Sequence, residues 1–225
     1  RCESCHDYDA AHTWLPYQQQ HRAAVACQTC HIPELHAPAV QTADWTVLTT
    51  AGSPALDCRG IGYEDPASAI PLLSGYQPVL LQRQNADGSS KLFPYNLVAS
   101  WYWVYGNPQR PVPYRNLEAA WLEGEGYHAE VVALFDADGD GQISTPELKI
   151  DTPEKEAAIA ARLSAQGLDN PRIAGEVQPY SIHHSVAGGD SAIRDFRVCH
   201  GDDSRMGQSL LLAGSPPGGV VPQFV

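Results

Sequence analysis

The chain has 225 residues, 43% of them hydrophobic and 8% aromatic, which is the composition of a globular protein rather than a disordered tail. Its 26 Asp and Glu against 14 Lys and Arg give a formal net charge of -12 and a pI near 5.0. This acidity argues against non-specific binding to nucleic acid or to an anionic membrane, because both attract cationic patches. No apolar run approaches the roughly 20 residues of a membrane helix, so no membrane span is expected. Because the chain opens next to a motif at Arg1, we expect that it has been processed or trimmed.

Four of the six cysteines form two Cys-x-x-Cys-His motifs, at 2–6 and 27–31. This is the attachment motif of c-type haem. Two thiols three residues apart on a helical turn reach the two vinyl groups of one porphyrin, and the next side chain directs its imidazole at the iron. A zinc site of the four thiolates is the alternative, but it leaves both histidines without a role. The sequence therefore predicts two covalent haems, held by Cys2, Cys5, His6, Cys27, Cys30 and His31.

The segment between the two motifs predicts a helix from Pro16 to about Cys27, since proline is favoured at a first helical position and good helix formers follow. His21 lies on this helix and His12 lies in the segment before it. The two histidines therefore need not face the same haem.

Cys58 lies outside the motifs, in a turn-rich stretch. Its simplest interpretation is a small buried residue or an unused thiol. An axial thiolate, a catalytic sulfur and a thioether to an incompletely attached haem are the alternatives, and the neighbouring Arg59 would favour a thiolate.

The middle of the chain predicts short strands. Residues 45–50 are rich in β-formers, and 78–83 and 95–105 flank an Asp-Gly turn that indicates a hairpin. The alternating aromatic residues from Trp101 to Tyr105 are expected in the core, although they could also wall a haem edge.

Residues 136–147 match the calcium loop of an EF-hand. Carboxylates stand at loop positions 1, 3, 5 and 12, Gly141 permits the sharp turn at position 6, and Ile143 is the apolar anchor. An acidic solvated turn is the alternative, but it would not place these residues together. No second loop is found, so we expect a structural clamp rather than a sensor. The expected Ca²⁺ ligands are Asp136, Asp138, Asp140, the backbone carbonyl of Gln142, and Glu147.

Helices are expected on both sides of this loop. The first is predicted over 116–135, although Gly124 and Gly126 weaken its middle. The second begins with Thr152 as N-cap and Pro153 at the first helical position, and it ends at Gly167.

A third haem motif, at 196–200, lacks one thiol: Phe196 holds the position of the first cysteine, whereas Cys199 and His200 are in place. A free thiol beside a surface histidine is the alternative. Because ligation by His200 does not need the second bond, and a Phe ring suits the porphyrin edge, we predict a haem held by a single thioether. Residues 209–225 read as an irregular tail.

Low-spin electron-transfer haems need a second strong axial ligand, and Met206 is the only methionine. Bis-histidine irons are therefore expected, with Met206 as an alternative ligand of the third haem. His183 and His184 are adjacent in an extended segment, so their side chains point to opposite faces. His36 and His128 are weaker candidates, and an unused histidine could reach a haem in a neighbouring chain. The expected distal ligands are His12, His21, His183 and His184.

Because haem-binding cysteines occur near both ends, the two ends must meet around one cofactor cluster. This predicts a single domain, 1–225, with 116–167 as an inserted EF-hand-like calcium-binding segment. The expected fold class is α+β with much irregular structure, organised around covalent haems.

Residues 27–33 and 12–14 resemble multihaem c-type cytochromes of bacteria and archaea, and within that group the octahaem tetrathionate-reductase-like cytochromes. The resemblance covers mainly 1–50 and 176–213. It implies covalent haems in close chains, bis-histidine irons, export before haem attachment and electron transfer. The sequence departs from the pattern at Phe196 and has too few motifs for eight haems, so substrate reduction is not carried over.

The function expected from these features is electron transfer by an exported protein with about three haems, in the periplasm or outside the cell. It would serve as a subunit of a respiratory complex or of a cytochrome filament. Its partners would be other redox proteins or further copies of the chain. A haem-dependent reductase of a sulfur or nitrogen oxyanion is the alternative, and a calcium-clamped domain stiffened by haem is a third. No catalytic residue is assigned.

Overall fold

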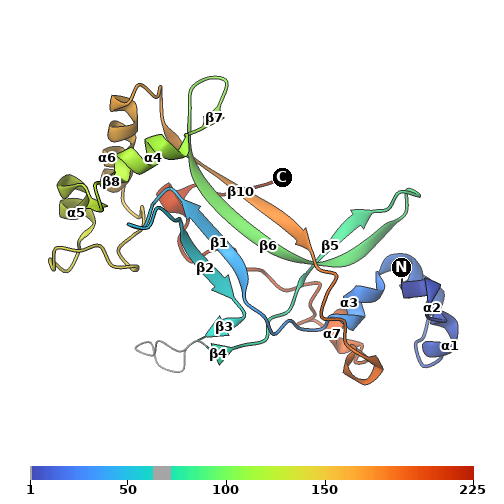
Figure 1. Ribbon diagram of the computed structural model, residues 1–225. Coiled ribbons are helices and arrows are strands. Elements are labelled where there is room, and N and C mark those ends of the chain that lie inside the picture. Colours follow the sequence, from blue (N-terminus) through green and yellow to red (C-terminus); the bar gives the residue numbers. More distant parts are fainter. Residues whose placement is uncertain (1, 63–71) are drawn as a thin grey trace. The chain divides into compact units, whose positions relative to one another are not determined.

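The structure is a computed structural model that describes residues 2–62 and 72–225 (Figure 1). It is a mixed α and β protein with much irregular structure, which confirms the expected secondary-structure class. The chain divides into two compact units. Unit 1 comprises Arg1–Ala39, Arg59–Leu97 and Pro179–Leu210, and unit 2 comprises Val40–Cys58, Val98–Gln178 and Leu211–Val225. The expected single domain stays a prediction.

Unit 1 holds short helices and a hairpin arm. Its short 3-10 helices are η1 (Cys2–Ser4) and η2 (Gly189–Ser191). Its α-helices are α1 (Tyr8–Ala11), α2 (Gln18–Ala24), α3 (Cys27–His31) and α7 (Arg197–His200). Its strands are β3 (Ile61–Gly62), β4 (Leu72–Leu73) and β5 (Val79–Gln84).

The helix predicted from Pro16 to Cys27 is confirmed only in its middle. Helix α2 begins at Gln18, after Tyr17 in a left-handed conformation with φ 53°, and it ends at Ala24. Extended backbone at Val25 and Ala26 then separates α2 from α3. His21 therefore lies on α2, whereas Cys27 begins a separate turn of helix.

The predicted hairpin is confirmed. Strand β5 pairs antiparallel with the start of β6 (Ser90–Tyr105), from Val79 opposite Tyr95 to Gln84 opposite Ser90. Gly88 takes φ 82° in the connecting turn, a conformation that L side chains rarely adopt.

Unit 2 holds most of a mixed sheet and the helices that follow it. Its strands and 3-10 helix include β1 (Ala39–Trp45), β2 (Ala55–Arg59), β7 (Arg110–Pro111), β8 (Leu122–Glu123), β9 (Gly126–Tyr127), η3 (Pro217–Gly219) and β11 (Gln223–Phe224). Its α-helices are α4 (Tyr114–Trp121), α5 (Ala129–Phe135) and α6 (Pro153–Ala165). Strands β6 and β10 (Arg172–Ser181) begin or end in unit 1.

The sheet has the order β11-β10-β6-β1-β2, with β1 parallel to β6. The predicted strand at 45–50 is misplaced, because β1 ends at Trp45. Thr46 instead donates two hydrogen bonds to Asp44 Oδ1, from its backbone nitrogen at 2.8 Å and its hydroxyl at 2.5 Å. This local pairing turns the chain out of the strand.

The core interpretation of the strand aromatics is confirmed for the two tryptophans of β6. Trp101 and Trp103 are both 1% exposed. Their indole nitrogens donate to backbone carbonyls, Trp101 to Val220 at 2.8 Å and Trp103 to Thr46 at 2.9 Å. Each ring is thus buried with its polar atom satisfied.

The single helix predicted over 116–135 is wrong. Helix α4 ends at Trp121, the β8–β9 hairpin follows, and α5 begins at Ala129 (Figure 1). Gly124 takes φ 66° in the hairpin turn, so the glycines that weaken the helical pattern end the helix here. The break lets Trp121 and Phe135, both fully buried, meet with ring centroids 5.0 Å apart.

The second predicted helix is confirmed as α6. The Thr152 side chain accepts a hydrogen bond from the backbone nitrogen of Lys155 at 3.3 Å, as an N-cap does. Ile159 and Leu163 are fully buried on its inner face.

The expected irregular tail is partly ordered. Strand β11 pairs in parallel with β10, with Glu176 opposite Gln223 and Val177 opposite Phe224. Among the described residues, no helix has both the length and the apolar character needed to cross a membrane.

Candidate functional site

All the residues proposed to bind haem lie in unit 1, although they come from both ends of the chain. The turn of α3 carries Cys27, Cys30 and His31, and α7 carries Cys199 and His200 (Figure 1). Backbone hydrogen bonds join the two regions: Ile193 donates to the carbonyl of Cys30 at 3.0 Å, and Ala187 donates to that of His31 at 2.7 Å. In the described part of unit 1, the segment before the third motif thus lies against the second motif. That the two ends of the chain meet around one haem cluster stays a prediction.

His31 is oriented by a backbone carbonyl. Its Nδ1 lies 3.0 Å from the oxygen of Ala187. Because a carbonyl can only accept, Nδ1 carries the hydrogen and the lone pair is left on Nε2. This is the usual arrangement of a metal-ligating histidine, in which the second ring nitrogen fixes the tautomer and the ring orientation.

His12 is oriented in the same way, and its ring lies close to that of His31. Its Nδ1 lies 2.8 Å from the carbonyl oxygen of Tyr8, one helical turn back. The His12 and His31 rings have centroids 6.0 Å apart and planes inclined by 82°. Two imidazoles bound at about 2 Å to opposite sides of one metal ion would have centroids roughly 6 Å apart. The two residues therefore fit the axial positions of one haem.

A second pair has the same spacing. The rings of His21 and His200 have centroids 6.0 Å apart and planes inclined by 88°. His21 Nδ1 lies 3.2 Å from the carbonyl oxygen of Tyr17, which again leaves Nε2 for a metal. The pair joins α2 to the incomplete third motif.

Phe196, which replaces the first cysteine of the third motif, contacts an aromatic residue near the second. Its ring lies 6.4 Å from that of Trp14, and the Trp14 ring lies 6.4 Å from that of His12. The guanidinium of Arg194 covers Trp14 at 5.5 Å. Phe196 is 45% exposed, so one part of the ring remains available for a further apolar surface.

The thiols of Cys27, Cys30 and Cys199 do not have the lowered pKa of a redox dithiol. Burial raises the pKa of Cys30 to about 11, with a further contribution from Cys199. Burial also raises the pKa values of Cys27 and Cys199. Reactive thiols need a lowered pKa, so this environment argues against thiol–disulfide chemistry.

The zinc alternative also lacks support. Within residues 2–62 and 72–225, one group of three side chains could hold a metal ion, with ligand atoms within 4.8 Å of one another: Asp136, Asp138 and Glu147. The four motif thiols form no such group in this described part.

The other candidate ligands are not paired with a motif histidine among the described residues. Among the described residues, neither His183 nor His184 lies in ring contact with His6, and the Nδ1 of His184 is 3.2 Å from the hydroxyl of Ser185. The Nε2 of His36 lies 3.3 Å from Glu34. The distal ligand of the first motif therefore remains a prediction.

His128 is occupied by contacts in unit 2. Its Nδ1 lies 3.5 Å from Glu123, and its Nε2 lies 3.2 Å from the carbonyl oxygen of Ala119. Both ring nitrogens are engaged, which argues against haem ligation.

Cys58 is half-buried in β2, and Met206 is 54% exposed.

The predicted calcium loop closes on itself through its carboxylates. Glu147 accepts from the backbone nitrogens of Ala137 at 2.7 Å and Ser144 at 2.8 Å, and from the Ser144 hydroxyl at 2.6 Å. These bonds, that of the Ser144 hydroxyl first, lower the pKa of Glu147 to about 2. Its carboxylate is therefore ionised at neutral pH and is held at the mouth of the loop.

The other end of the loop has matching geometry. Asp136 accepts from the backbone nitrogens of Gly139 at 2.7 Å and Gly141 at 2.8 Å. Asp140, at the fifth position, accepts from the nitrogen of Gln142 at 2.8 Å. Gly141 takes φ 85°, the left-handed conformation that the sequence predicts for the sixth position. The loop follows α5 directly, whereas α6 begins six residues after Glu147, a difference from the contiguous second helix of a typical EF-hand.

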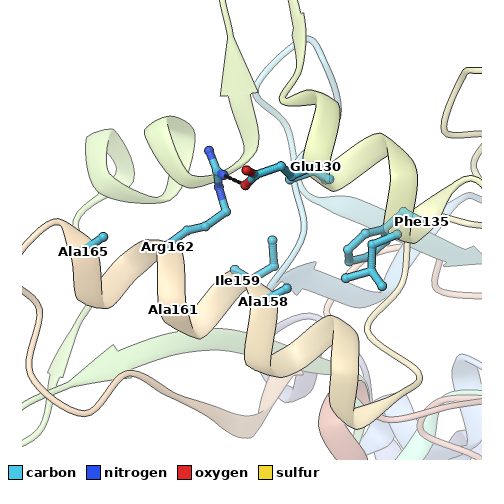
Figure 2. Close-up of a pocket in the computed structure, with 9 residues that line it drawn as sticks. Glu130, Phe135, Ala158, Ile159, Ala161, Arg162 and Ala165 are labelled. Atoms are coloured by element: carbon cyan, nitrogen blue, oxygen red, sulfur yellow. Dashed lines mark hydrogen bonds and ion pairs between the residues drawn. The ribbon is translucent and has the colours of Figure 1, made fainter.

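A groove of about 420 Å³ lies between the two helices that flank this loop. Figure 2 shows Glu130 of α5 reaching Arg162 of α6 beside Ile159 and Phe135, and the ion pair measures 3.0 Å. Apart from this pair the lining is apolar. The groove therefore offers a packing surface rather than a set of catalytic groups.

No protein-family model matches the chain, and no curated protein matches it. Comparison with solved structures finds the octaheme cytochrome c from Shewanella oneidensis, with a TM-score of 0.47 and 16% sequence identity. The match covers 91% of this chain and 49% of that one, so the chain spans about half the length of that cytochrome. This is a distant structural resemblance, and the assignments that follow are based on the residues of this chain.

Proposed function

We propose that the chain is a c-type cytochrome with three haems that carries electrons between redox partners. The observation that supports this most strongly is the pairing of His12 with His31 and of His21 with His200, each at 6.0 Å between ring centroids. Each pair contains one histidine of a haem motif and one from outside the motifs. An imidazole close to a motif histidine can supply the second strong ligand that a low-spin electron-transfer haem needs.

The second haem would be held by the thiols of Cys27 and Cys30 and by the imidazoles of His31 and His12. The third would be held by the single thiol of Cys199, with His200 and His21. Phe196 would stand where a second thiol is absent. The first would be held by Cys2, Cys5 and His6, with its distal ligand from His183 or His184.

A bound haem supplies one-electron exchange between ferric and ferrous iron. The chain's own residues determine where and how firmly its ligands stand. The carbonyls of Tyr8, Tyr17 and Ala187 each accept from an imidazole Nδ1, which fixes the ring and increases the basicity of Nε2. The hydrogen bonds from Ala187 and Ile193 to the second motif hold the segment before the third motif against it, which favours electron passage between the two sites.

The proposed calcium site is a structural clamp formed by Asp136, Asp138, Asp140, Glu147 and the carbonyl of Gln142. It is supported by the ligand atoms of three of these carboxylates, which lie within 4.8 Å of one another. A bound divalent ion would offset their mutual repulsion and fix the connection between α5 and α6. The segment 116–167 would then be a stabilising insertion in the cytochrome.

The setting proposed for the protein is the periplasm or the cell exterior, where c-type haems are attached after export. Its partners would be other redox proteins or further copies of the same chain. The net charge of -12 favours a basic partner surface or a divalent-ion bridge.

The proposal is tested by expressing the chain with a haem-attachment system and recording its spectra. We expect a haemochrome after denaturation in alkaline pyridine, a low-spin ferric signal by electron paramagnetic resonance, and reversible reduction. Carbon monoxide should bind to neither the second nor the third haem. A protein without covalent haem, or one in which carbon monoxide binds all the haems, would contradict the proposal.

A further inference from the structure

Arg205 lies where the second and third haem motifs meet. Its backbone nitrogen donates to the carbonyl of Val198 at 2.9 Å, next to Cys199. Its Nη1 donates to the carbonyl of Thr29 at 3.3 Å, next to Cys30. One residue therefore touches both attachment segments, although it follows the last motif by only five positions.

The guanidinium is held firmly, but its charge is not neutralised by these contacts. Besides Thr29, it donates from Nη2 to the carbonyl of Pro78 at 3.1 Å. Its Nε is buried and has no hydrogen-bond partner. Carbonyls are neutral acceptors, so Arg205 places a full positive charge in a partly desolvated position. The exposed Arg197 is different, since it pairs with the carboxylate of Asp195 at 2.7 Å.

Among the residues that the structure describes, the titratable groups that face Arg205 are the thiols of Cys30 and Cys199. Both would be consumed by thioether bonds in the haem-loaded protein. The cation would then have the two haems as its principal neighbours.

We propose that Arg205 raises the reduction potentials of the second and third haems together, by holding a fixed positive charge between their attachment sites. This inference rests on the proposed function. Reduction adds one electron to each iron, supplied by the redox partner or by an electrode, and a nearby positive charge stabilises the reduced form. The effect is largest where water is excluded, because the effective dielectric constant is low.

A purely structural role is the competing explanation, since the side chain also ties Thr29 to Pro78. Two substitutions separate the roles. Arg205→Lys keeps the charge but loses the forked contact, and Arg205→Gln removes the charge but keeps a donor. Arg197→Gln is the matched control, because it removes the same charge from the same region at a side chain that is 87% exposed.

The test is a potentiometric titration of the haem-loaded protein, followed by visible absorbance, with haem content checked by intact mass. We expect Arg205→Gln to lower two midpoint potentials by about 59 mV each, which corresponds to a tenfold change in the one-electron equilibrium constant. Arg205→Lys should shift them much less, and Arg197→Gln should hardly change them. Unchanged potentials in Arg205→Gln, or equal shifts in the two Arg205 variants at the lowest pH of the titration, where the lysine is protonated, would overturn the inference.

Arg205→Lys also provides a test that does not depend on Arg205→Gln retaining its haems. A buried ammonium can lose its proton, whereas a guanidinium cannot. The two potentials should therefore fall as the pH rises in Arg205→Lys and stay flat in the wild-type protein. Potentials in Arg205→Lys that equal those of Arg205→Gln at every pH would contradict the role of the charge. A protein with no covalent haem would instead refute the proposed function, so the two failures are distinguishable.

Discussion

The imidazole of His12 faces that of His31, with ring centroids 6.0 Å apart, and each ring turns its Nδ1 toward a backbone carbonyl. The two residues are separated along the chain by α2, and the fold brings their rings together. Only His31 belongs to a recognisable motif. The sequence offers His12 only as one of four candidates, and this geometry supports it as the proposed distal ligand of the second haem.

Replacing His12 removes the proposed distal ligand of the second haem. We expect His12→Ala to keep its full complement of covalent haems, because attachment depends on Cys27 and Cys30. One haem should become high-spin and should bind carbon monoxide, since its iron has lost one strong ligand. Electron paramagnetic resonance and carbon monoxide difference spectra measure both effects.

The control for this variant is His128→Ala. Both ring nitrogens of His128 contact other groups, Glu123 and the carbonyl of Ala119. Its removal should leave the spectra unchanged. A high-spin signal in His128→Ala, or a fully low-spin spectrum in His12→Ala, would show that the ligand assignment is wrong.

Cys199 is the only thiol of the third motif. We expect Cys199→Ala to reduce the number of covalent haems from three to two, without affecting the other sites. Cys58→Ala, which removes a half-buried thiol from β2, is the matched control and should retain three. Haem staining after denaturing electrophoresis, together with intact mass, makes the comparison. Three covalent haems in Cys199→Ala would refute a thioether at this position.

The calcium loop should contribute to thermal stability. Because the ion binds the folded loop and not the unfolded chain, saturating Ca²⁺ should raise the Tm by about 5–10 °C. Glu147→Gln should abolish this rise, since the amide cannot supply a bidentate carboxylate. Differential scanning calorimetry with Ca²⁺ and with a chelator provides the measurement.

Glu125→Gln is a suitable control, because it makes the same charge change at an exposed turn outside the loop. It should keep the full response to Ca²⁺. A Tm that does not depend on Ca²⁺ in the wild-type protein would mean that the loop is only an acidic turn.

Asp44 makes a prediction about pH that is independent of the haems. Burial raises its pKa from an ordinary 3.8 to about 6, although the two hydrogen bonds from Thr46 oppose the shift. A carboxyl whose pKa is higher in the folded state holds its proton more tightly there. Its contribution to stability is therefore fully present below the unfolded pKa and is lost as the pH rises through the folded value.

Asp44→Asn should remove this pH dependence and raise the free energy of unfolding at pH 7 by up to about 3 kcal/mol. The substitution keeps the acceptor oxygen that Thr46 uses, so the local turn is preserved. Urea unfolding at a series of pH values tests it. Asp57→Asn, at an exposed position in β2, should leave the profile unchanged. The predicted direction would be wrong if the free energy of unfolding of the wild-type protein rose between pH 4 and 7 and Asp44→Asn removed that rise.

The parts of the structure that local sequence determines were predictable. Thr152 and Pro153 begin α6 as the capping rules require, the Asp-Gly turn forms the β5–β6 hairpin, and Gly141 takes the left-handed conformation of the loop. These features depend on a few neighbouring residues.

The errors arise where long-range packing competes with local pattern. The 116–135 segment has helical spacing, but burial of Trp121 against Phe135 favours a hairpin between two helices. Strand β11 forms because its backbone pairs with the distant strand β10. In the candidate site, the motif residues are visible in sequence, whereas the carbonyl of Ala187 and the cation of Arg205 carry no motif and come together only through the fold.

The most direct test of the central claim is the intact mass of the chain after expression with a haem-attachment system. We expect an excess over the protein mass equal to three haems. One haem should be lost when Cys2 and Cys5 are replaced together, and another when Cys27 and Cys30 are replaced together. A mass equal to that of the chain alone would contradict the account, and the motifs would then need a different explanation.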